Sequence, residues 1–273
     1  MILSASYNFY NGEEHLKASL QSIRNQVDYI TIVYQKQSNA GNPISDEALT
    51  ILHDVKKEKL CDKLIEFTPN LNKARQENEL EKRRIGLQAA LRKKCSHFFT
   101  IDADEFYREK ELKYAKDYIE KNRILATSCC SFFHLKRPIY RSKDITCCSF
   151  ITKLSKEITI GGDYYIPYID PTRSLKHTHK TVTNKFLQFF SKREIEHHHF
   201  NEDIVAMYHM NFVRKDNLKS KFANTSTTDT TFLNQVAQAI DHWHYGEIFT
   251  FPNKGDFTIE IVENEFHTYD PIK

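Results

Sequence analysis

The sequence predicts an α/β protein with a mostly parallel central sheet and helices on both faces. Short runs rich in Ile, Val, Phe and Tyr alternate with longer polar runs whose apolar residues recur at helical spacing. The first strand, helix and strand, within residues 2–34, are compact enough for one right-handed βαβ crossover. An apolar run at 97–101 then leads directly into carboxylates, as a buried strand does when it brings acids to the edge of a sheet.

The composition limits the classes of function. A chain of 273 residues can bury a full core, as one large domain or as a domain with a smaller lobe. The formal net charge of +3 gives no global signature of nucleic-acid binding, so no nucleic-acid partner is expected. The 7 glycines argue against the usual Gly-rich phosphate loops, so other groups must hold any phosphate.

The cysteines and the apolar runs bear on the cellular compartment. The 6 cysteines include the adjacent pairs Cys129-Cys130 and Cys147-Cys148, and no C-x-x-C spacing occurs. Neighbouring residues of a strand point to opposite faces, so we expect reduced thiols rather than a disulfide framework or a zinc site. The chain starts with a strand-like run and contains no apolar stretch of membrane-spanning length. A cytoplasmic protein is therefore expected.

The first elements build the parallel part of the sheet. Residues 2–7 and 28–34 are expected to form strands because they concentrate apolar, β-branched and aromatic side chains. The helix between them, at 13–25, carries Leu16 and Ile23 on one face, which we expect to pack on the sheet.

The next elements lead to the acidic strand. A loop containing Gly and Pro precedes a helix at 46–59, and a strand at 63–68 precedes a long helix at 73–94. The first half of the long helix is almost entirely charged, while its second half has an apolar side. Beyond the acids, a helix at 108–122 is followed by β-rich segments that extend the sheet in the antiparallel sense.

The acids at the end of the 97–101 strand are Asp102, Asp104 and Glu105. Open α/β sheets bind their ligands at the carboxyl ends of strands, and two Asp separated by one small residue can share a divalent cation. Hard oxygen ligands suit Mg²⁺ or Mn²⁺. The alternative is that these acids only cap the following helix, because Asp and Glu favour helix N-termini.

Several of these motifs occur in the same order in a known family. Tyr7-Asn8 ends the first strand, Asn11-Gly12-Glu13-Glu14 opens the first helix, and Phe99-Thr100-Ile101-Asp102-Ala103-Asp104-Glu105 ends the acidic strand. In these features the chain resembles GT-A glycosyltransferases, close to family 2, over roughly its first hundred residues and more loosely beyond them. The resemblance implies a GT-A, or nucleotide-diphospho-sugar transferase, fold.

The resemblance also implies that the two halves of the chain bind different substrates. Residues 1–107 would be the nucleotide-sugar-binding half, and residues 108–273 would be the acceptor-side half of the same catalytic domain. Asp102 and Asp104 would bind Mn²⁺ or Mg²⁺ and, through it, a diphosphate. A His from a late strand often completes that site, and His209 matches this element.

The expected nucleotide contacts come from the first strand, the turn after the second strand and the long helix. The family has an acidic, Ser-rich turn where this chain has Gln35 and Gln37, so an amide contact to the base is expected instead. Arg and Lys of the long helix are suited to a diphosphate, the alternative being a solvated helix face. The predicted nucleotide-binding residues are Ser6, Tyr7, Asn8, Gln35, Lys73, Arg75, Arg83, Arg84 and Asp102.

An inverting transfer needs a carboxylate that deprotonates the acceptor hydroxyl. Carboxylates after the acidic strand include Asp163, Asp170, Glu202 and Asp203, and we predict Asp163 or the Glu202-Asp203 pair as the base. A retaining mechanism needs no such base, and the sequence leaves both mechanisms open.

Three aromatic features each allow two interpretations. The Tyr-rich residues 164–170 either line a sugar site or form a packed loop. The basic and aromatic run at 178–190 either makes a peripheral membrane contact or packs into the domain. Trp243 either covers an acceptor sugar or anchors the C-terminal helix.

The expected function is transfer of a hexosyl or N-acetylhexosaminyl group from a nucleotide diphosphate sugar to a glycan or lipid-linked glycan, in cell-surface polysaccharide or lipooligosaccharide synthesis. A phosphatase of the haloacid-dehalogenase type is one alternative, because it also places Asp-x-Asp at a strand end. Its motif continues differently, however, since Glu105 follows here. A non-catalytic carbohydrate-binding module is the other alternative, and it would not need the acidic cluster.

Overall fold

The computed structural model describes residues 1–155, 158–162, 169–177, 194–225 and 227–272. Within this part of the chain, strands β3, β2, β1 and β4 lie side by side in that order and run parallel. Their bounds are Lys63–Glu66, Tyr29–Tyr34, Leu3–Phe9 and His97–Asp102. This part of the sheet is the parallel half that the sequence predicts.

The sheet continues beyond β4 with mixed directions. Strand β7 is antiparallel to both β4 and β6, strands β10 and β11 are parallel to β6, and β5 is antiparallel to β11. The short β14, Glu260–Ile261, pairs with β7. The other bounds are Tyr140–Lys153 for β7, Ile124–Leu135 for β6, Ile195–Phe200 for β10, Ala206–Phe212 for β11 and Glu105–Phe106 for β5. The predicted α/β class with an antiparallel extension is confirmed.

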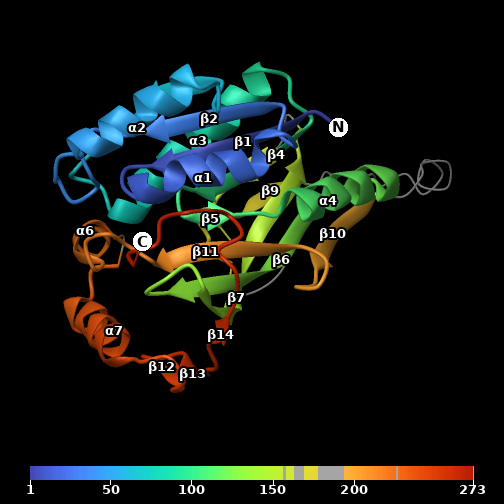
Figure 1. Cartoon of the computed structure of the whole chain (residues 1–273). Coiled ribbons are helices and arrows are strands. Elements are labelled where there is room, and N and C mark those ends of the chain that lie inside the picture. The colour runs from blue at the N-terminus through green and yellow to red at the C-terminus, as the bar shows by residue number, and fades with distance from the viewer. Residues whose placement is uncertain (156–157, 163–168, 178–193, 226, 273) are drawn as a thin grey trace.

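Helices cover both faces of the sheet (Figure 1). On one face, α1 (Glu13–Arg24), α2 (Asp46–Lys57) and α4 (Glu109–Asn122) pack their apolar sides onto the main core. On the other face, α3 (Arg75–Arg92) packs on β1, β2 and β4. The small hairpin of β8 (Ile158–Ile160) and β9 (Leu175–His177) adds to the core beside α3.

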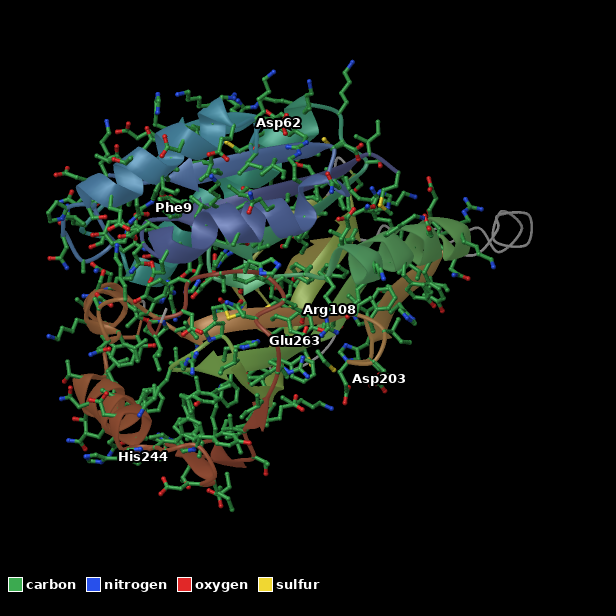
Figure 2. The ribbon with its side chains drawn as sticks, in the orientation of Figure 1. Phe9, Asp62, Arg108, Asp203, His244 and Glu263 are labelled. Atoms are coloured by element: carbon green, nitrogen blue, oxygen red, sulfur yellow. The ribbon has the colours of Figure 1, made fainter. Side chains whose placement is uncertain are left out.

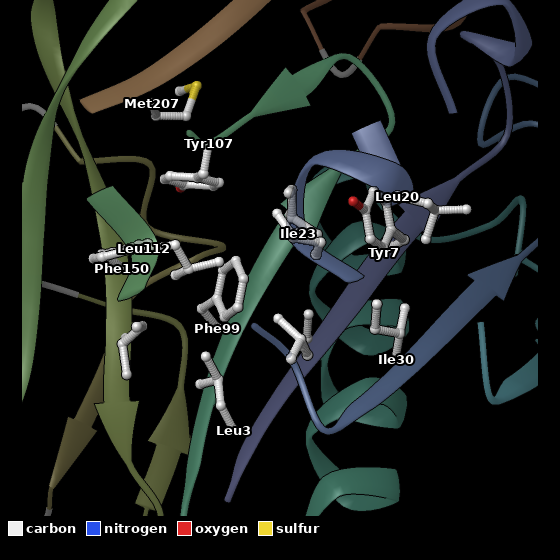
Figure 3. Packing of buried hydrophobic residues seen from close by; sticks show 14 of the residues in the cluster. Leu3, Tyr7, Leu20, Ile23, Ile30, Phe99, Tyr107, Leu112, Phe150 and Met207 are labelled. Carbon is white, nitrogen blue, oxygen red and sulfur yellow. The ribbon is translucent and has the colours of Figure 1, made fainter. Parts of the chain in front are cut away.

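The main core spans both predicted halves of the chain. Figure 3 shows Leu3 and Phe99 packed in the same cluster as Phe150 and Met207, which come from β7 and β11. Such a shared core means that the two halves bury their apolar surfaces against each other, as one packed unit does.

The opposite face of β1 allows α3 to approach unusually closely. Ser6 points toward α3, and a Cβ on Gly86 would lie only 1.8 Å from the Ser6 hydroxyl oxygen. The absence of a side chain at Gly86 is therefore required for this packing. The close approach brings the inner face of α3 against the carboxyl ends of β1 and β4.

The C-terminal elements form a lobe at one end of the sheet (Figure 1). Helix α6 (Lys219–Asn224) is followed by α7 (Thr230–His242) and by the hairpin of β12 (Phe249–Phe251) and β13 (Gly255–Phe257). Trp243 is 4% exposed and packs into the core of this lobe, which fits the interpretation that it anchors α7.

Two predicted aromatic features fall largely outside the described residues. They are the Tyr-rich stretch at 164–170, of which only the end is described, and the whole of the basic and aromatic run at 178–190. Among the residues that are described, no helix is both long enough and apolar enough to cross a bilayer.

Candidate active site

A polar cavity of about 290 Å³ lies at the carboxyl ends of β1, β2 and β4, where the sequence places a ligand. Asn8 and Asp102 are neighbours across the β1 and β4 strands, and both line the cavity. Elements from the far end of the chain close its other side. The lining includes Tyr10, Gln35, Ser38, Lys82, Asp104, His209, Asn211, Arg214 and Lys221.

Backbone pairing holds the acidic turn against β11. Glu105 and His209 are partners in the antiparallel pairing of β5 and β11, and the Met210 amide donates to the Asp104 carbonyl at 2.8 Å. This pairing sets the His209 ring beside the Asp104 carboxylate, with Nε2 3.3 Å from the nearer oxygen. The sequence predicts this proximity only through the family resemblance.

Two arginines hold the Asp102 carboxylate. Arg83 of α3 lies 3.3 Å from it, and Arg173 donates to it from the loop before β9. Burial raises the pKa of Asp102, but Arg173 and Arg83 outweigh burial and lower it to about 2. Asp102 is therefore a carboxylate at neutral pH, and both of its cationic partners are buried.

Three groups converge on Asp104. Lys221 of α6 donates to its carboxylate at 3.0 Å, Arg214 also donates to it, and His209 lies beside it. Burial raises the pKa of Asp104, but Lys221 and Arg214 bring it well below the ordinary range of an Asp. Asp104 is 5% exposed, so it is an ionised and nearly enclosed anion.

Glu105 stabilises the acidic turn that carries Asp102 and Asp104. Its carboxylate accepts a hydrogen bond from the Asp102 amide at 2.9 Å and contacts Arg173 at 2.6 Å. The side chain is 1% exposed, and burial raises its pKa. Glu105 therefore fixes the backbone of the acidic turn and helps to position Arg173.

Lys82 is a buried cation on the inner face of α3. Its ammonium donates to the Phe9 carbonyl at 2.9 Å and to the Gln35 side-chain oxygen at 3.2 Å. Burial lowers the pKa of Lys82 to about 7, although Asp102 and Glu79 act in the opposite direction. The charged first half of α3 thus turns some of its polar groups inward, toward the cavity, rather than to solvent.

A second cavity, of about 440 Å³, adjoins the first. Asp102 and His209 line both cavities and form the wall between them. The remaining lining residues are Glu105, Ser131, Thr146, Cys147, Cys148, Ile169, Asp170, Arg173 and Met207. The two cavities therefore share part of their lining.

Some of the predicted nucleotide-binding residues line the first cavity, and others do not. Asn8, Gln35 and Asp102 line the first cavity. Ser6 and Tyr7 do not, because Ser6 is buried under α3 and Tyr7 is buried in the core with its hydroxyl on Ser19.

The basic residues predicted on the long helix divide in the same way. Lys73 pairs with Glu81 and lies with Arg75 beside another surface cavity, and Arg84 is exposed. Arg83 is the exception, because it faces inward and reaches Asp102. The helix period decides this difference, since neighbouring residues on a helix point about 100° apart.

Of the predicted catalytic bases, the two that the structure describes do not line these cavities. Asp163 lies outside the described residues. Glu202 pairs with Lys143 on the turn between β10 and β11, and neither Glu202 nor Asp203 lines the two cavities. Figure 2 shows Asp203 well separated from Phe9, whose carbonyl accepts from Lys82 at the first cavity. The structure therefore does not place the Glu202-Asp203 pair at either cavity, and its catalytic role stays a prediction.

The predicted metal ligands Asp102, Asp104 and His209 do lie together at the first cavity. Their arrangement does not fit a divalent cation, however, because Asp102 is held by two arginines and Asp104 by Arg214 and Lys221. Among the described residues, no group of three or more His, Cys, Asp or Glu is arranged to hold a metal ion. The Mn²⁺ or Mg²⁺ site stays a prediction.

Four cations of the site carry little or no signal in the sequence, namely Lys82, Arg173, Arg214 and Lys221. Arg173 and Lys221 lie 71 and 117 positions from the acids that they contact. Lys82 has a weak signal, because Asn78, Lys82 and Gly86 recur at a spacing of four and form the buried stripe of α3.

Comparisons with known proteins find no matching family model and no matching curated protein. Some solved structures are similar to part of the chain. TarS 1–349 from S. aureus matches 50% of this chain and 36% of its own length, at 16% identity and a TM-score of 0.35. The mannosyltransferase PcManGT from Pyrobaculum calidifontis, in complex with GDP-Man and Mn²⁺, matches 50% of this chain and 36% of its own, at 19% identity and a TM-score of 0.33.

A third structure, the mannose-1-phosphate geranyltransferase from Thermus thermophilus, matches 57% of this chain and 51% of its own length, at 10% identity and a TM-score of 0.32. This chain thus spans about a third to a half of the length of these proteins. The TM-scores are too low to assign an activity to it.

Proposed function

We propose that the chain is a glycosyltransferase of the GT-A type, which moves a sugar from a nucleotide diphosphate sugar to a hydroxyl of a glycan. The observation that carries the proposal is the pair of cavities that share Asp102 and His209 as a common wall. A group-transfer enzyme must hold its donor and its acceptor with the reacting atoms in contact. A polar cavity at the carboxyl ends of the parallel strands, with a second cavity adjoining it, meets this requirement.

The first cavity suits the nucleotide diphosphate. It lies at the carboxyl ends of β1 and β2, where α/β sheets receive nucleotides, and it contains Lys82, Arg214 and Lys221. Negative charge builds on the leaving diphosphate as the bond to the sugar breaks, and preorganised cations stabilise that charge. The amide of Gln35 orients Lys82 and also donates to Asn39, so its role is to position a cation beside the donor.

The second cavity suits the acceptor, and Asp170 is its best-placed base. One oxygen of Asp170 accepts from the Thr172 amide and hydroxyl, and the other lies 3.9 Å from Arg173. The side chain is 45% exposed, so the second oxygen can reach an acceptor hydroxyl. Asp102 and Glu105 also line this cavity, but arginines hold them. With Asp170 as this base, we assign an inverting transfer.

The finer assignments rest on the same proposal. We assign the donor to the hexosyl or N-acetylhexosaminyl class and the acceptor to glycans or lipid-linked glycans of the cell surface, with the enzyme in the cytoplasm, on the family resemblance of the sequence. The phosphatase alternative needs Asp102 as a free nucleophile, whereas Arg83 and Arg173 hold this carboxylate. A binding module has no use for buried cations beside two adjoining cavities.

The test is a thermal-shift screen of UDP-, GDP-, CDP- and dTDP-sugars, followed by a transfer assay with the sugar that stabilises most. A ligand that binds the native state at 100 times its Kd adds about 2.7 kcal/mol to stability and raises Tm. We expect one nucleotide class to raise Tm and to transfer its sugar to an oligosaccharide mixture. Release of inorganic phosphate from a phosphomonoester, without binding of any nucleotide sugar, would contradict the proposal.

A further inference from the structure

The cations around Asp104 have donors without a hydrogen-bond partner in the part of the chain that the structure describes. Arg214 is 8% exposed and gives one nitrogen to Asp104, while its Nε and Nη1 have no hydrogen-bond partner among the described residues. Buried donors without partners cost free energy, so native proteins usually pair them with protein, water or ligand. Glu14 lies 3.7 Å from Nη1, which balances part of the charge without making a hydrogen bond.

The fold makes room for this guanidinium. Gly12 precedes α1 with φ +85°, and a Cβ at this position would lie 2.6 Å from Arg214 Nη1. A side chain at position 12 would therefore collide with the part of Arg214 that has unused donors. The glycine keeps the guanidinium at the edge of the first cavity, which Asn11 and Ala103 also line.

Lysines approach the same cavity from two other elements. Lys221 donates to Asp104 and to Asn211, and its side chain is 22% exposed. Lys82 donates to Phe9 and Gln35 from the opposite wall. An ammonium group has three donors, so each lysine retains one beyond these contacts.

A divalent cation at Asp104 would have to sit among these positive groups. Asp104 carries a single negative charge and already faces Arg214 and Lys221. A metal ion there would be repelled by both cations or would have to displace them. A diphosphate, in contrast, would be attracted by both cations, and Lys221, whose side chain is 22% exposed, has a donor left to pair with it.

We propose that Arg214 and Lys221 hold the diphosphate of the donor directly, and that Asp104 keeps these two cations in place instead of ligating a metal ion. The inference deepens the proposed function and rests on it. Asp104 is then a positioning residue, and donor binding does not require a divalent cation. The arrangement gives the diphosphate the charge of a guanidinium and the point charge of an ammonium group.

The test measures binding of UDP, GDP, CDP and dTDP by calorimetry, each with EDTA and with MnCl₂, and compares the best diphosphate with its monophosphate. We expect the diphosphate to bind in EDTA with an affinity within threefold of that in Mn²⁺. Lys221→Met should weaken diphosphate binding at least tenfold in both buffers and should reduce its preference over the monophosphate. Lys219→Met removes an exposed lysine of the same helix and should change neither value.

The Asp104→Asn variant separates the two roles of this residue. If Asp104 ligated a metal ion, Asp104→Asn would abolish the binding that the parent shows with Mn²⁺. If Asp104 is a positioning residue, the variant should bind the diphosphate in EDTA with an affinity within about tenfold of the parent. Arg214→Lys keeps the positive charge but not the planar guanidinium, and it should weaken binding. It serves as a second variant if circular dichroism shows that Asp104→Asn does not fold. Binding that appears only with Mn²⁺ would overturn the inference and leave the proposed function standing. Absence of binding in every buffer would overturn both.

Discussion

Arg83 and Asp102 form an ion pair 3.3 Å apart between the middle of α3 and the end of β4. The Arg83 side chain is 1% exposed, and it also donates to the Thr100 hydroxyl at 2.7 Å and to Glu79. A guanidinium at this depth is tolerated because its two terminal nitrogens contact two carboxylates and a hydroxyl, while its Nε has no hydrogen-bond partner among the described residues. The pair ties the nucleotide side of the cavity to the acidic turn.

Replacing Arg83 by Met should therefore destabilise the protein by about 3 kcal/mol, because it leaves Asp102 with a single cationic partner and buries acceptors without donors. The measurement is urea denaturation followed by circular dichroism. Arg84→Met is the matched control, because Arg84 is the next residue and is exposed. It should stay within about 0.5 kcal/mol of the parent protein. Equal losses in the two variants would show that Arg83 contributes no more than a surface arginine.

Replacing Asp170 by Asn should lower kcat by about 10²- to 10⁴-fold, the usual contribution of a general base. Donor binding should stay unchanged, because Asp170 lines the acceptor cavity and not the nucleotide cavity. Steady-state kinetics give kcat, and calorimetry with the donor nucleotide gives Kd. Asp203→Asn is the control, and it should leave both values unchanged. A kcat of Asp170→Asn equal to that of the parent would remove Asp170 as the base.

Nucleotide binding should weaken as pH rises above about 7, because of Lys82. Burial lowers the pKa of Lys82 to about 7, although Asp102 and Glu79 raise it. The ammonium therefore begins to lose its proton near this pH. A diphosphate beside it favours the charged form, which means that binding takes up a proton above this pH. The logarithm of the affinity should fall with a slope of up to about one per pH unit.

Calorimetry in buffers of different ionisation enthalpy measures this proton uptake directly. Lys82→Met should remove the uptake between about pH 7 and pH 9 and leave a weaker, flatter affinity. Lys93→Met changes a lysine at the far end of α3 and should keep the slope of the parent. A parent affinity that is independent of pH in this range would contradict the assignment of Lys82 to the donor site.

Acid should destabilise the fold through His15. Its ring is 0% exposed and contacts the Thr268 hydroxyl at 2.7 Å and the Val213 carbonyl at 2.6 Å. Burial, aided by Arg214, lowers the pKa of His15 to about 3. The unfolded chain therefore binds a proton below about pH 6.5 that the folded protein does not bind, so stability falls as pH falls from about 6.5 toward 3.

The slope from this one group should be about 1.4 kcal/mol per pH unit. Urea denaturation between about pH 7 and pH 4.5 measures it. His15→Gln should be less stable at neutral pH. Its free energy of unfolding should fall less steeply with falling pH than that of the parent, by the slope that corresponds to about one bound proton. His53→Gln changes a histidine whose side chain is 78% exposed and should keep the slope of the parent. Parallel curves for His15→Gln and the parent would exclude His15 as a source of acid sensitivity.

The local elements and the place of the ligand follow from the order of the residues alone. Apolar spacing predicts the first four strands and the helices between them, because periodicity depends only on which face each residue presents. The run from Phe98 into Asp102 and Asp104 locates the site, since a buried strand that ends in acids must deliver them to the edge of the sheet. These features are carried by neighbouring residues, so the linear sequence is sufficient for them.

The role of each acid, in contrast, depends on how distant segments pack. Arg173, Arg214 and Lys221 come from loops and a short helix far along the chain, and no local pattern marks a cation that meets its partner across 71 to 117 positions. The same limit applies to the base. The sequence offers Asp163 and the Glu202-Asp203 pair alike, and the folded chain places Glu202 and Asp203 away from both cavities. Whether a carboxylate binds a metal, holds a cation or takes a proton depends on the charges packed around it, and these charges are assembled only when the whole chain has folded.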